Sequence, residues 1–250
     1  MFAVSRASPF LIALSVCLIL SGCVRRPPEP LRPSSYPGGY PSRTEAPLVG
    51  GLVDRAIDGG TQGAVVREGR DLERCLAELN AARVRFSPVP DRQNTATCGL
   101  SQGGVLGADL GTVARLAPGD VEMTCQTALA LSIWRRQSLE PAAREILGSD
   151  VVQIDHMGAY ACRNVNNGVG SNRISAHSQA AALDFAGVRL RDGRRITVTK
   201  DWSGDAPEAR FLRRIRDDAC RIFGTTLSPD YNAVHHDHLH LEATDTRFCR

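Results

Sequence analysis

Apolar side chains along this chain recur with two different periods, which predict a mixture of helices and strands. Residues 71–80 place apolar side chains three and four positions apart, the spacing of an amphipathic helix. The same spacing predicts a helix over residues 209–223, and another over residues 124–147, in which Pro141 marks a second turn or a kink. Helices are therefore expected in the first half, the middle and the last third of the chain.

Shorter apolar stretches predict strands. Two of them flank a glycine-containing turn at residues 191–194, as in a β-hairpin. The expected strands are residues 84–86, 151–154, 183–190, 195–198, 224–227 and 238–242.

The Gly-rich run at residues 98–105 lacks the Lys-Ser/Thr ending of a phosphate-binding loop, so it is interpreted as a turn. The combined pattern predicts an α+β fold: a single domain with a central antiparallel sheet flanked by helices.

The N-terminus has the pattern of an export signal. Arg6 provides a positive start, residues 9–20 are apolar but too few to span a bilayer comfortably, and Leu-Ser-Gly-Cys follows at residues 20–23. We therefore expect a lipoprotein signal peptide at residues 1–22 and a lipid on Cys23. Val24, rather than Asp, follows that cysteine, and the resemblance to bacterial lipoproteins then implies the outer membrane in a cell that has two.

A proline-rich stretch follows the proposed lipid site. Residues 23–51 have the composition of an extended tether, and residues 52–250 are long enough for one domain with its own core. A tether of this kind would hold the domain on the periplasmic side of the envelope. The formal charge of +3 is too small and too dispersed to indicate nucleic-acid binding.

Six of the eight cysteines remain once Cys17 and Cys23 are assigned to the signal peptide and the lipid. An even number in an exported chain predicts three disulfides, although six cysteines allow about fifteen pairings. On loop length, Cys75 with Cys98 and Cys220 with Cys249 are the pairs to try first. The other two cysteines are Cys125 and Cys162.

Five of the six histidines fall within residues 175–184 and 233–242. In a strand, His238 and His240 point to the same side, and Asp184 and His177 can reach the same place from a neighbouring strand and its preceding loop. Two imidazoles and one carboxylate with an open fourth position are typical of a catalytic zinc site. We therefore expect His177, Asp184 and His240 to bind Zn²⁺.

These motifs resemble a known family. Ser-x-His at residues 175–177, Leu-Asp-Phe-Ala-Gly at 183–187, Pro-Asp-Tyr-Asn-Ala at 229–233 and the final histidine cluster resemble the bacterial extensin-like C-terminal domain, over roughly residues 72–249. The zinc signature is also similar to that of D-Ala-D-Ala metallopeptidases, penicillin-insensitive murein endopeptidases and the zinc-binding domain of hedgehog proteins.

The resemblance implies roles for individual residues. His177, Asp184 and His240 correspond to the zinc ligands, and either Asp237 or His238 to the general base. Strand geometry favours His238 as the base, because Asp237 should point to the opposite side. His235 is a second candidate partner for the transition state.

Arg163 corresponds to an arginine that holds a substrate carboxylate, with Ser175 as a hydrogen-bond partner, although a lone arginine after a disulfide is as often simply solvated. His156 and His236 lie off the pattern and are interpreted as surface or loop histidines. Trp202 and Tyr231 are more typical of packing than of a substrate groove.

Two classes of function remain open at this point. The first is a lipid-anchored zinc metallopeptidase that hydrolyses peptide cross-links of peptidoglycan. The second is a non-catalytic, zinc-stabilised module that binds the wall or another envelope protein. An open coordination position and His238 beside His240 favour catalysis, because purely structural zinc sites are more often closed by a fourth ligand.

Overall fold

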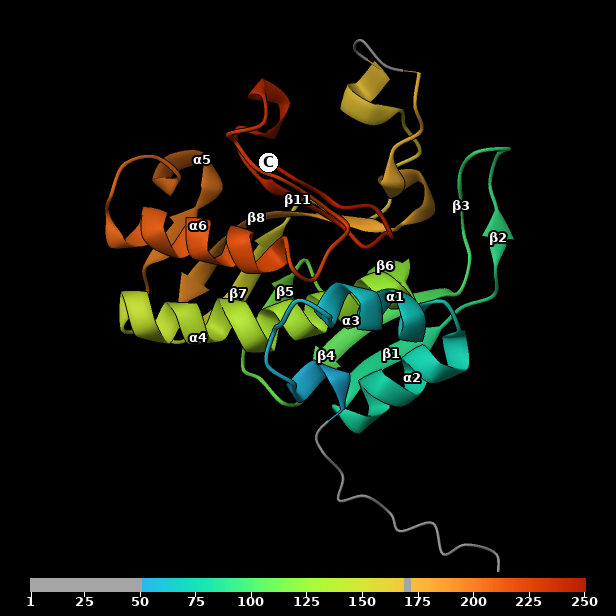
Figure 1. The fold of residues 1–250 in the computed structure, drawn as a ribbon, viewed down its shortest axis with the longest axis horizontal. Coiled ribbons are helices and arrows are strands. Elements are labelled where there is room, and N and C mark those ends of the chain that lie inside the picture. The colour runs from blue at the N-terminus through green and yellow to red at the C-terminus, as the bar shows by residue number, and fades with distance from the viewer. Residues whose placement is uncertain (1–50, 169–171) are drawn as a thin grey trace, which may run out of the picture. The chain divides into compact units, whose positions relative to one another are not determined.

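The computed structural model describes residues 51–168 and 172–250, which contain both helices and strands (Figure 1). The expected signal peptide, Cys23 and all of the expected tether but Gly51 lie outside the described residues. So does part of the loop before Ser175. Within the described ranges, no helix is both long and apolar enough to cross a membrane.

The main sheet of the described chain has seven strands. Its order is β12 (Phe248–Cys249), β10 (Thr225–Leu227), β11 (Leu239–Glu242), β8 (Ala182–Leu190), β7 (Val151–His156) and β5 (Arg115–Ala117), with β9 (Arg195–Thr197) paired to β8.

The prediction of a wholly antiparallel sheet is wrong at two places, because β5 pairs with β7 and β10 with β12 in parallel. A parallel pair needs a long crossover, and the long helical segment before β7 lies between β5 and β7 in the chain. The central pairs, β11 with β8 and β8 with β7, are antiparallel as expected.

The expected helix over residues 124–147 is continuous but not uniform. It comprises α3 (Cys125–Trp134), a π-helical stretch η2 (Arg135–Leu139), α4 (Glu140–Ala142) and a second π-helical stretch η3 (Ala143–Leu147). Pro141 thus lies between two widened stretches instead of ending the helix. Thr124 caps α3 by accepting a hydrogen bond from the Thr127 amide.

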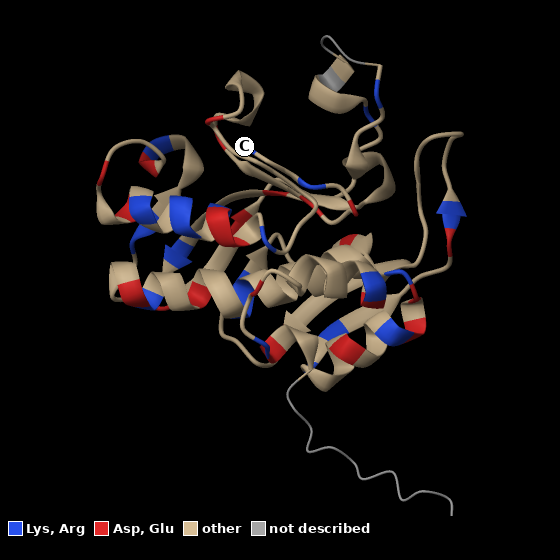
Figure 2. Cartoon of the chain, in the orientation of Figure 1, with Lys and Arg blue, Asp and Glu red and all other residues tan. Residues whose placement is uncertain are grey.

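Helix α3 is buried on every side rather than on one face. It carries no charged side chain, whereas α2 (Leu72–Ala81) and α6 (Pro207–Ala219) carry charges on their outer faces (Figure 2). It packs against α2, α6 and α1 (Thr61–Gly69). At its end, the Trp134 indole donates to the carbonyl of Ile215 and meets the Phe185 ring edge-on, so α3, α6 and β8 are joined at one point.

A smaller layer is built from the first part of the described chain, up to Thr124, apart from β5. It contains a short 3₁₀ helix η1 (Leu52–Asp54), α1, α2 and a three-stranded sheet of β1 (Val84–Pro88), β4 (Gly103–Asp109) and β6 (Val121–Thr124), with a hairpin of β2 (Arg92–Gln93) and β3 (Gly99–Leu100).

The interpretation of residues 98–105 as a turn is therefore wrong, since only Ser101 and Gln102 lie outside strands between β3 and β4. Glycine is needed in this run for close strand contact. A Cβ on Gly104 would lie 2.4 Å from the carbonyl oxygen of Ser87.

Most of the other predicted elements are confirmed, with shifted ends. Helix α2, strands β1, β7, β10 and β11, the β8–β9 hairpin and helix α6 lie where the pattern placed them. Strand β8 begins at Ala182, two residues before Asp184. Helix α1 and the short α5 (Val198–Asp201) were not predicted.

All six expected cysteines are paired. The pair Cys220 with Cys249 is confirmed, but Cys75 bonds to Cys125 and Cys98 bonds to Cys162. Cys75 lies on α2 where this helix packs against the start of α3, so its nearest cysteine in space is 50 residues away in the chain. Loop length could not reveal this contact.

The three bonds give a direct prediction. Each closes a loop of 29 to 64 residues, for which chain entropy predicts about 4 kcal/mol of stabilisation. Replacing both Cys75 and Cys125 by alanine should lower the free energy of unfolding by about that amount, measured by urea denaturation. Free-thiol titration of the denatured, unreduced wild type should find no reactive thiol among these six cysteines. Several reactive thiols would contradict the pairing.

Candidate metal centre

The register between β8 and β11 brings two candidate ligands together. Asp184 and His240 lie directly opposite each other in this antiparallel pair, so their side chains share one face of the sheet. Their neighbours Phe185 and Leu239 are fully buried, as strand alternation requires of residues that point to the opposite face.

The third candidate ligand, His177, comes from the loop that leads into β8. It lies in the 3₁₀ helix η5 (Ala176–Gln179). Ser175 caps this helix, and its hydroxyl accepts a hydrogen bond from the His177 amide. Ala180 ends this turn in the left-handed region, with φ of 52°, and the chain then enters β8. Ser175 therefore holds the backbone that carries His177.

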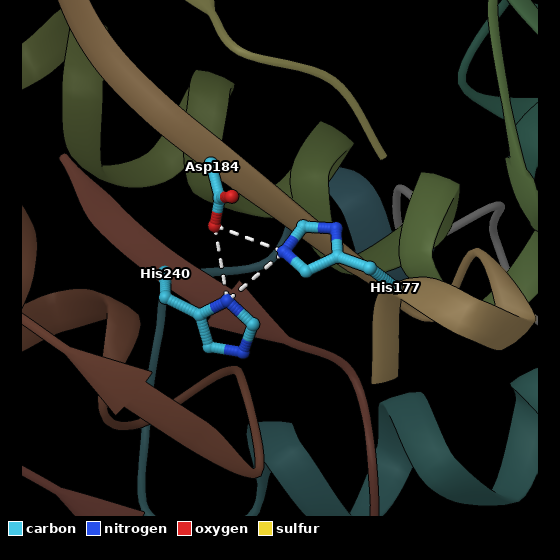
Figure 3. Close-up of side chains that lie close together, drawn as sticks. All are labelled: His177, Asp184 and His240. Carbon is cyan, nitrogen blue, oxygen red and sulfur yellow. Dashed lines mark hydrogen bonds and ion pairs between the residues drawn. The ribbon is translucent and has the colours of Figure 1, made fainter. Parts of the chain in front are cut away.

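The three side chains converge on one point (Figure 3). The Nε2 atom of His177 lies 3.0 Å from Oδ1 of Asp184 and 3.1 Å from Nδ1 of His240, and the last two atoms are 3.0 Å apart. All three residues are buried. Among the described residues they form a group that could hold a metal ion.

The hydrogen-bond partners of the outward-facing ring nitrogens fix the tautomers of His177 and His240. Nδ1 of His177 is 2.9 Å from the Ala159 carbonyl oxygen, and Nε2 of His240 is 3.4 Å from a carboxylate oxygen of Glu242. Both partners can only accept, so both outward nitrogens carry hydrogen. The inward nitrogens of the neutral rings then present lone pairs to each other and to Asp184, an arrangement that needs a cation at its centre.

Without a metal ion, a proton on an inward nitrogen supplies this positive charge, and the pKa shifts of the cluster describe that protonated state. Burial alone raises the pKa of Asp184, but hydrogen bonds with His177 and His240 outweigh it and hold the pKa well below its usual range. Burial alone lowers the pKa of His240, but hydrogen bonds with Asp184 and Glu242 raise it to about 9. The carboxylate is thus ionised, and a positive charge is favoured between it and the imidazoles.

His238 lies immediately before β11 and faces the same cluster. Its Nε2 atom is 3.6 Å from Oδ1 of Asp184, and its Nδ1 atom is 2.8 Å from a carboxylate oxygen of Asp237. The expectation that Asp237 points away is wrong, because strand alternation applies only from Leu239 onward. Asp237 instead holds the His238 ring with Nε2 directed at the cluster.

His235 lies in the 3₁₀ helix η6 (Ala233–His235), and its ring is 5.1 Å from that of His238. Its Nδ1 atom is 2.7 Å from Oδ1 of Asn232, which also accepts the Val234 amide hydrogen. That Nδ1 therefore carries the hydrogen, and Nε2 is the acceptor. Burial, with the nearby charge of His238 and His240, lowers the pKa of His235 to about 4, so the ring is neutral at neutral pH.

A cleft of about 480 Å³ lies beside the cluster, with His235, His238 and His240 in its lining. Its two walls come from residues around η4 (Val165–Gly168) and around η6, which rise from the same side of the sheet (Figure 1). The expected substrate residues Arg163 and Ser175 also line it. The Arg163 guanidinium is 3.7 Å from Oδ2 of Asp184, and its side chain is 31% exposed.

The structure also places the other aromatic and histidine residues that the sequence singled out. Trp202 is buried and donates to Asp230, so it is a packing residue, whereas Tyr231 lines the cleft. His236 is exposed as expected. The surface or loop interpretation of His156 is wrong, because this side chain is buried at the end of β7 and contacts the Pro118 carbonyl.

Sequence reasoning missed the partners that orient the histidines of the site: Ala159 for His177, Glu242 for His240 and Asn232 for His235. The period of two along β11 could have identified Glu242, which follows His240 on the same face. No sequence signal indicates the Ala159 carbonyl, which reaches His177 because the chain turns at Gly158, where φ is 116°.

Fold and site together define an α+β domain, held by disulfides, with a buried histidine and carboxylate cluster beside a cleft. The model of the family described as extensin-like protein C-terminus matches residues 73–250, and the chain belongs to this family. No curated protein and no solved structure matches the chain.

The cluster gives a second prediction. Single changes His177→Ala and His240→Ala should each abolish tight metal binding, because each removes one of three convergent donors. Metal analysis after dialysis against limiting free zinc, with calorimetric titration, measures this. His236→Ala is the matched control, since this exposed histidine lies outside the cluster. Full metal retention in both ligand variants would refute the site.

Proposed function

We propose that this protein is a zinc-dependent peptidase of the cell envelope that hydrolyses peptide cross-links of peptidoglycan. The observation that carries the proposal is the position of His238. Its Nε2 atom lies on the wall of a cleft, 3.6 Å from the carboxylate oxygen at which the metal ligands converge. A purely structural site has no need of an oriented imidazole beside an accessible ion.

Zinc is the ion that suits this donor set. Two imidazoles and one carboxylate are typical of catalytic zinc sites that keep a fourth position for water or substrate. Tetrahedral bonds of about 2.0 to 2.1 Å separate neighbouring donors by roughly 3.3 Å. The separations of 3.0 to 3.1 Å between the donor atoms need only a small adjustment to reach this value.

When bound, the ion would supply Lewis-acid chemistry by polarising the scissile carbonyl and acidifying a water. His238 Nε2 carries the lone pair, because Nδ1 donates to Asp237, so it accepts the proton of the attacking water and returns it to the leaving amine. Asp237 stabilises the imidazolium formed between these two steps. This division of roles follows the general logic of a base and the carboxylate that orients it.

Two other residues support binding in this mechanism. Arg163 offers guanidinium donors to a substrate carboxylate from the cleft wall, and the Ser175 hydroxyl retains a hydrogen for donation while its oxygen accepts from His177. His235 is neutral with an acceptor at Nε2, so we assign it to a substrate N–H group rather than to the oxyanion of a transition state.

The choice of peptidoglycan rests on two considerations. The motifs resemble those of D-Ala-D-Ala metallopeptidases and murein endopeptidases, and the N-terminal sequence resembles that of a bacterial lipoprotein. A lipoprotein of the cell envelope would lie close to the wall.

A third prediction separates catalysis from metal binding. Zinc-loaded His238→Ala protein should keep its metal and lose at least a hundredfold of its hydrolysis of purified peptidoglycan, because a general base contributes about 10²- to 10⁴-fold. Asp237→Asn should show a smaller loss and a changed pH profile, since the ring loses its orienting carboxylate. Fragments released from the wall, with and without a chelator, provide the measurement.

The outcome also decides between the two classes of function. Wild-type protein that binds zinc and purified wall material but releases no fragments would contradict the peptidase. It would instead favour the non-catalytic, zinc-stabilised binding module.

A fourth prediction concerns the anchor. Cys23→Ala protein should be released from the membrane in soluble form and should hydrolyse isolated peptidoglycan as the wild type does. The lipid would position the enzyme but supply no catalytic group, and a proline-rich tether of about 28 residues at about 3.1 Å each can extend roughly 85 Å. Membrane fractionation and the wall assay measure both effects. A folded, zinc-loaded but inactive Cys23→Ala protein would contradict the assignment of hydrolysis to the domain alone.

A further inference from the structure

Exposed apolar side chains gather around the cleft. In the part of the chain that the structure describes, seven large apolar side chains are prominently exposed, and four of them line this cleft. These four are Ile174, Tyr231, Val234 and Phe248, each 40 to 45% exposed. Exposed apolar groups that cluster in one concave place indicate binding more strongly than the same groups scattered over a surface.

The aromatic members continue a row of rings that starts at the metal centre. The ring of His235 is 6.0 Å from that of His240, Tyr231 is 5.6 Å from His235, and Phe248 is 5.7 Å from Tyr231. We call His235, Tyr231 and Phe248 the ring track. It leads from the reacting centre towards the edge of the sheet.

Sheet register gives the length of the ring track. His240 pairs with Leu227 on β10, and Thr225, two residues before Leu227, pairs with Phe248 on β12. Phe248 is therefore two strands across and two residues along from His240, a separation of roughly 12 Å between backbones. An extended peptide advances about 3.3 Å per residue, so about four residues would cover this distance.

The arrangement of the rings favours aliphatic peptide side chains over sugars. A pyranose stacks on an open aromatic face, but the Arg250 guanidinium already lies over the Phe248 ring, 5.3 Å from its centroid. Tyr231 and Phe248 meet nearly perpendicularly, at 83°, which occupies one further face. Two of the four faces of these rings are thus covered, and the perpendicular rings form a corner that suits methyl and methylene groups.

The charges of the cleft agree with a peptide. Its lining contains Arg163, Arg173 and Glu242, so groups of both signs are present within one cavity. A peptide carrying carboxylates and an amine can interact with groups of both signs in this lining, whereas an uncharged glycan forms no ion pair with either.

We propose that the ring track binds the peptide part of the substrate, placing short aliphatic side chains of an extended segment against Tyr231 and Phe248 on one side of the scissile amide. This inference rests on the proposed function, because it takes the metal centre as the place of cleavage. It adds a subsite that selects peptide stems by their apolar side chains and leaves the glycan outside the cleft.

Binding measurements on full-length, zinc-loaded protein with the His238→Ala change test the subsite without turnover. The probes are a synthetic wall stem pentapeptide that carries no sugar and a tetramer of N-acetylglucosamine that carries no peptide. Adding either Tyr231→Ala or Phe248→Ala should weaken pentapeptide binding about tenfold, as expected for an aromatic ring that the bound peptide covers. The sugar tetramer should show no binding that depends on either ring.

Leu110→Ala and Val113→Ala are matched controls, because these side chains are 50% and 51% exposed but do not line the cleft. Both should leave pentapeptide affinity unchanged. Thermal unfolding and metal content identify any variant that has lost its fold. Phe248 is next to Cys249, so if Phe248→Ala perturbs the disulfide, Tyr231→Ala still tests the ring track.

Three results would overturn the ring track: no pentapeptide binding, pentapeptide affinity insensitive to both ring changes, or sugar binding that Phe248→Ala abolishes. The experiments can refute the ring track and the proposed peptidase activity separately. Wild-type protein that cleaves the wall while both ring variants bind normally refutes only the track. Protein that binds the pentapeptide through the rings but releases no wall fragments refutes only the hydrolysis.

Discussion

The pairing of Asp184 with His240 across β8 and β11 is the constraint on which the site depends. Directly opposite positions in an antiparallel pair place both side chains on one face, and a one-residue slip would send one of them into the core. Phe185, the next residue on β8, packs on the opposite face against Trp134 and resists such a slip. Packing in the core therefore fixes the register of β8 and β11, and this register places Asp184 beside His240.

Burial gives this cluster its affinity for positive charge. A carboxylate and two imidazoles whose outward nitrogens are already committed present lone pairs to one another, which is unfavourable without a cation. The cluster that carries this cost lies beside the cleft, whose lining includes His240. Ala159 and Glu242 maintain it, because they fix the tautomers that direct lone pairs inward.

The cleft owes its walls to segments that are far apart in sequence. The disulfide between Cys162 and Cys98 joins the wall that contains Arg163 to the β2–β3 hairpin. In the other wall, His235 contacts Asn232 and the ring of Tyr231. Each wall is thus held by contacts outside β8 and β11, the strands that carry Asp184 and His240.

The sequence by itself determined the local elements and the set of candidate ligands. Helix α6, the β8–β9 hairpin and β11 follow from periodicity, and His177, Asp184 and His240 follow from histidines gathered in two short segments. Only the tertiary structure decided the parallel pairs, the partners of Cys75 and Cys98, the place of Asp237 beside His238, and the presence of Tyr231 in the cleft. Periodicity reports which face of an element is buried, whereas these features depend on contacts between segments dozens of residues apart, which no local pattern encodes.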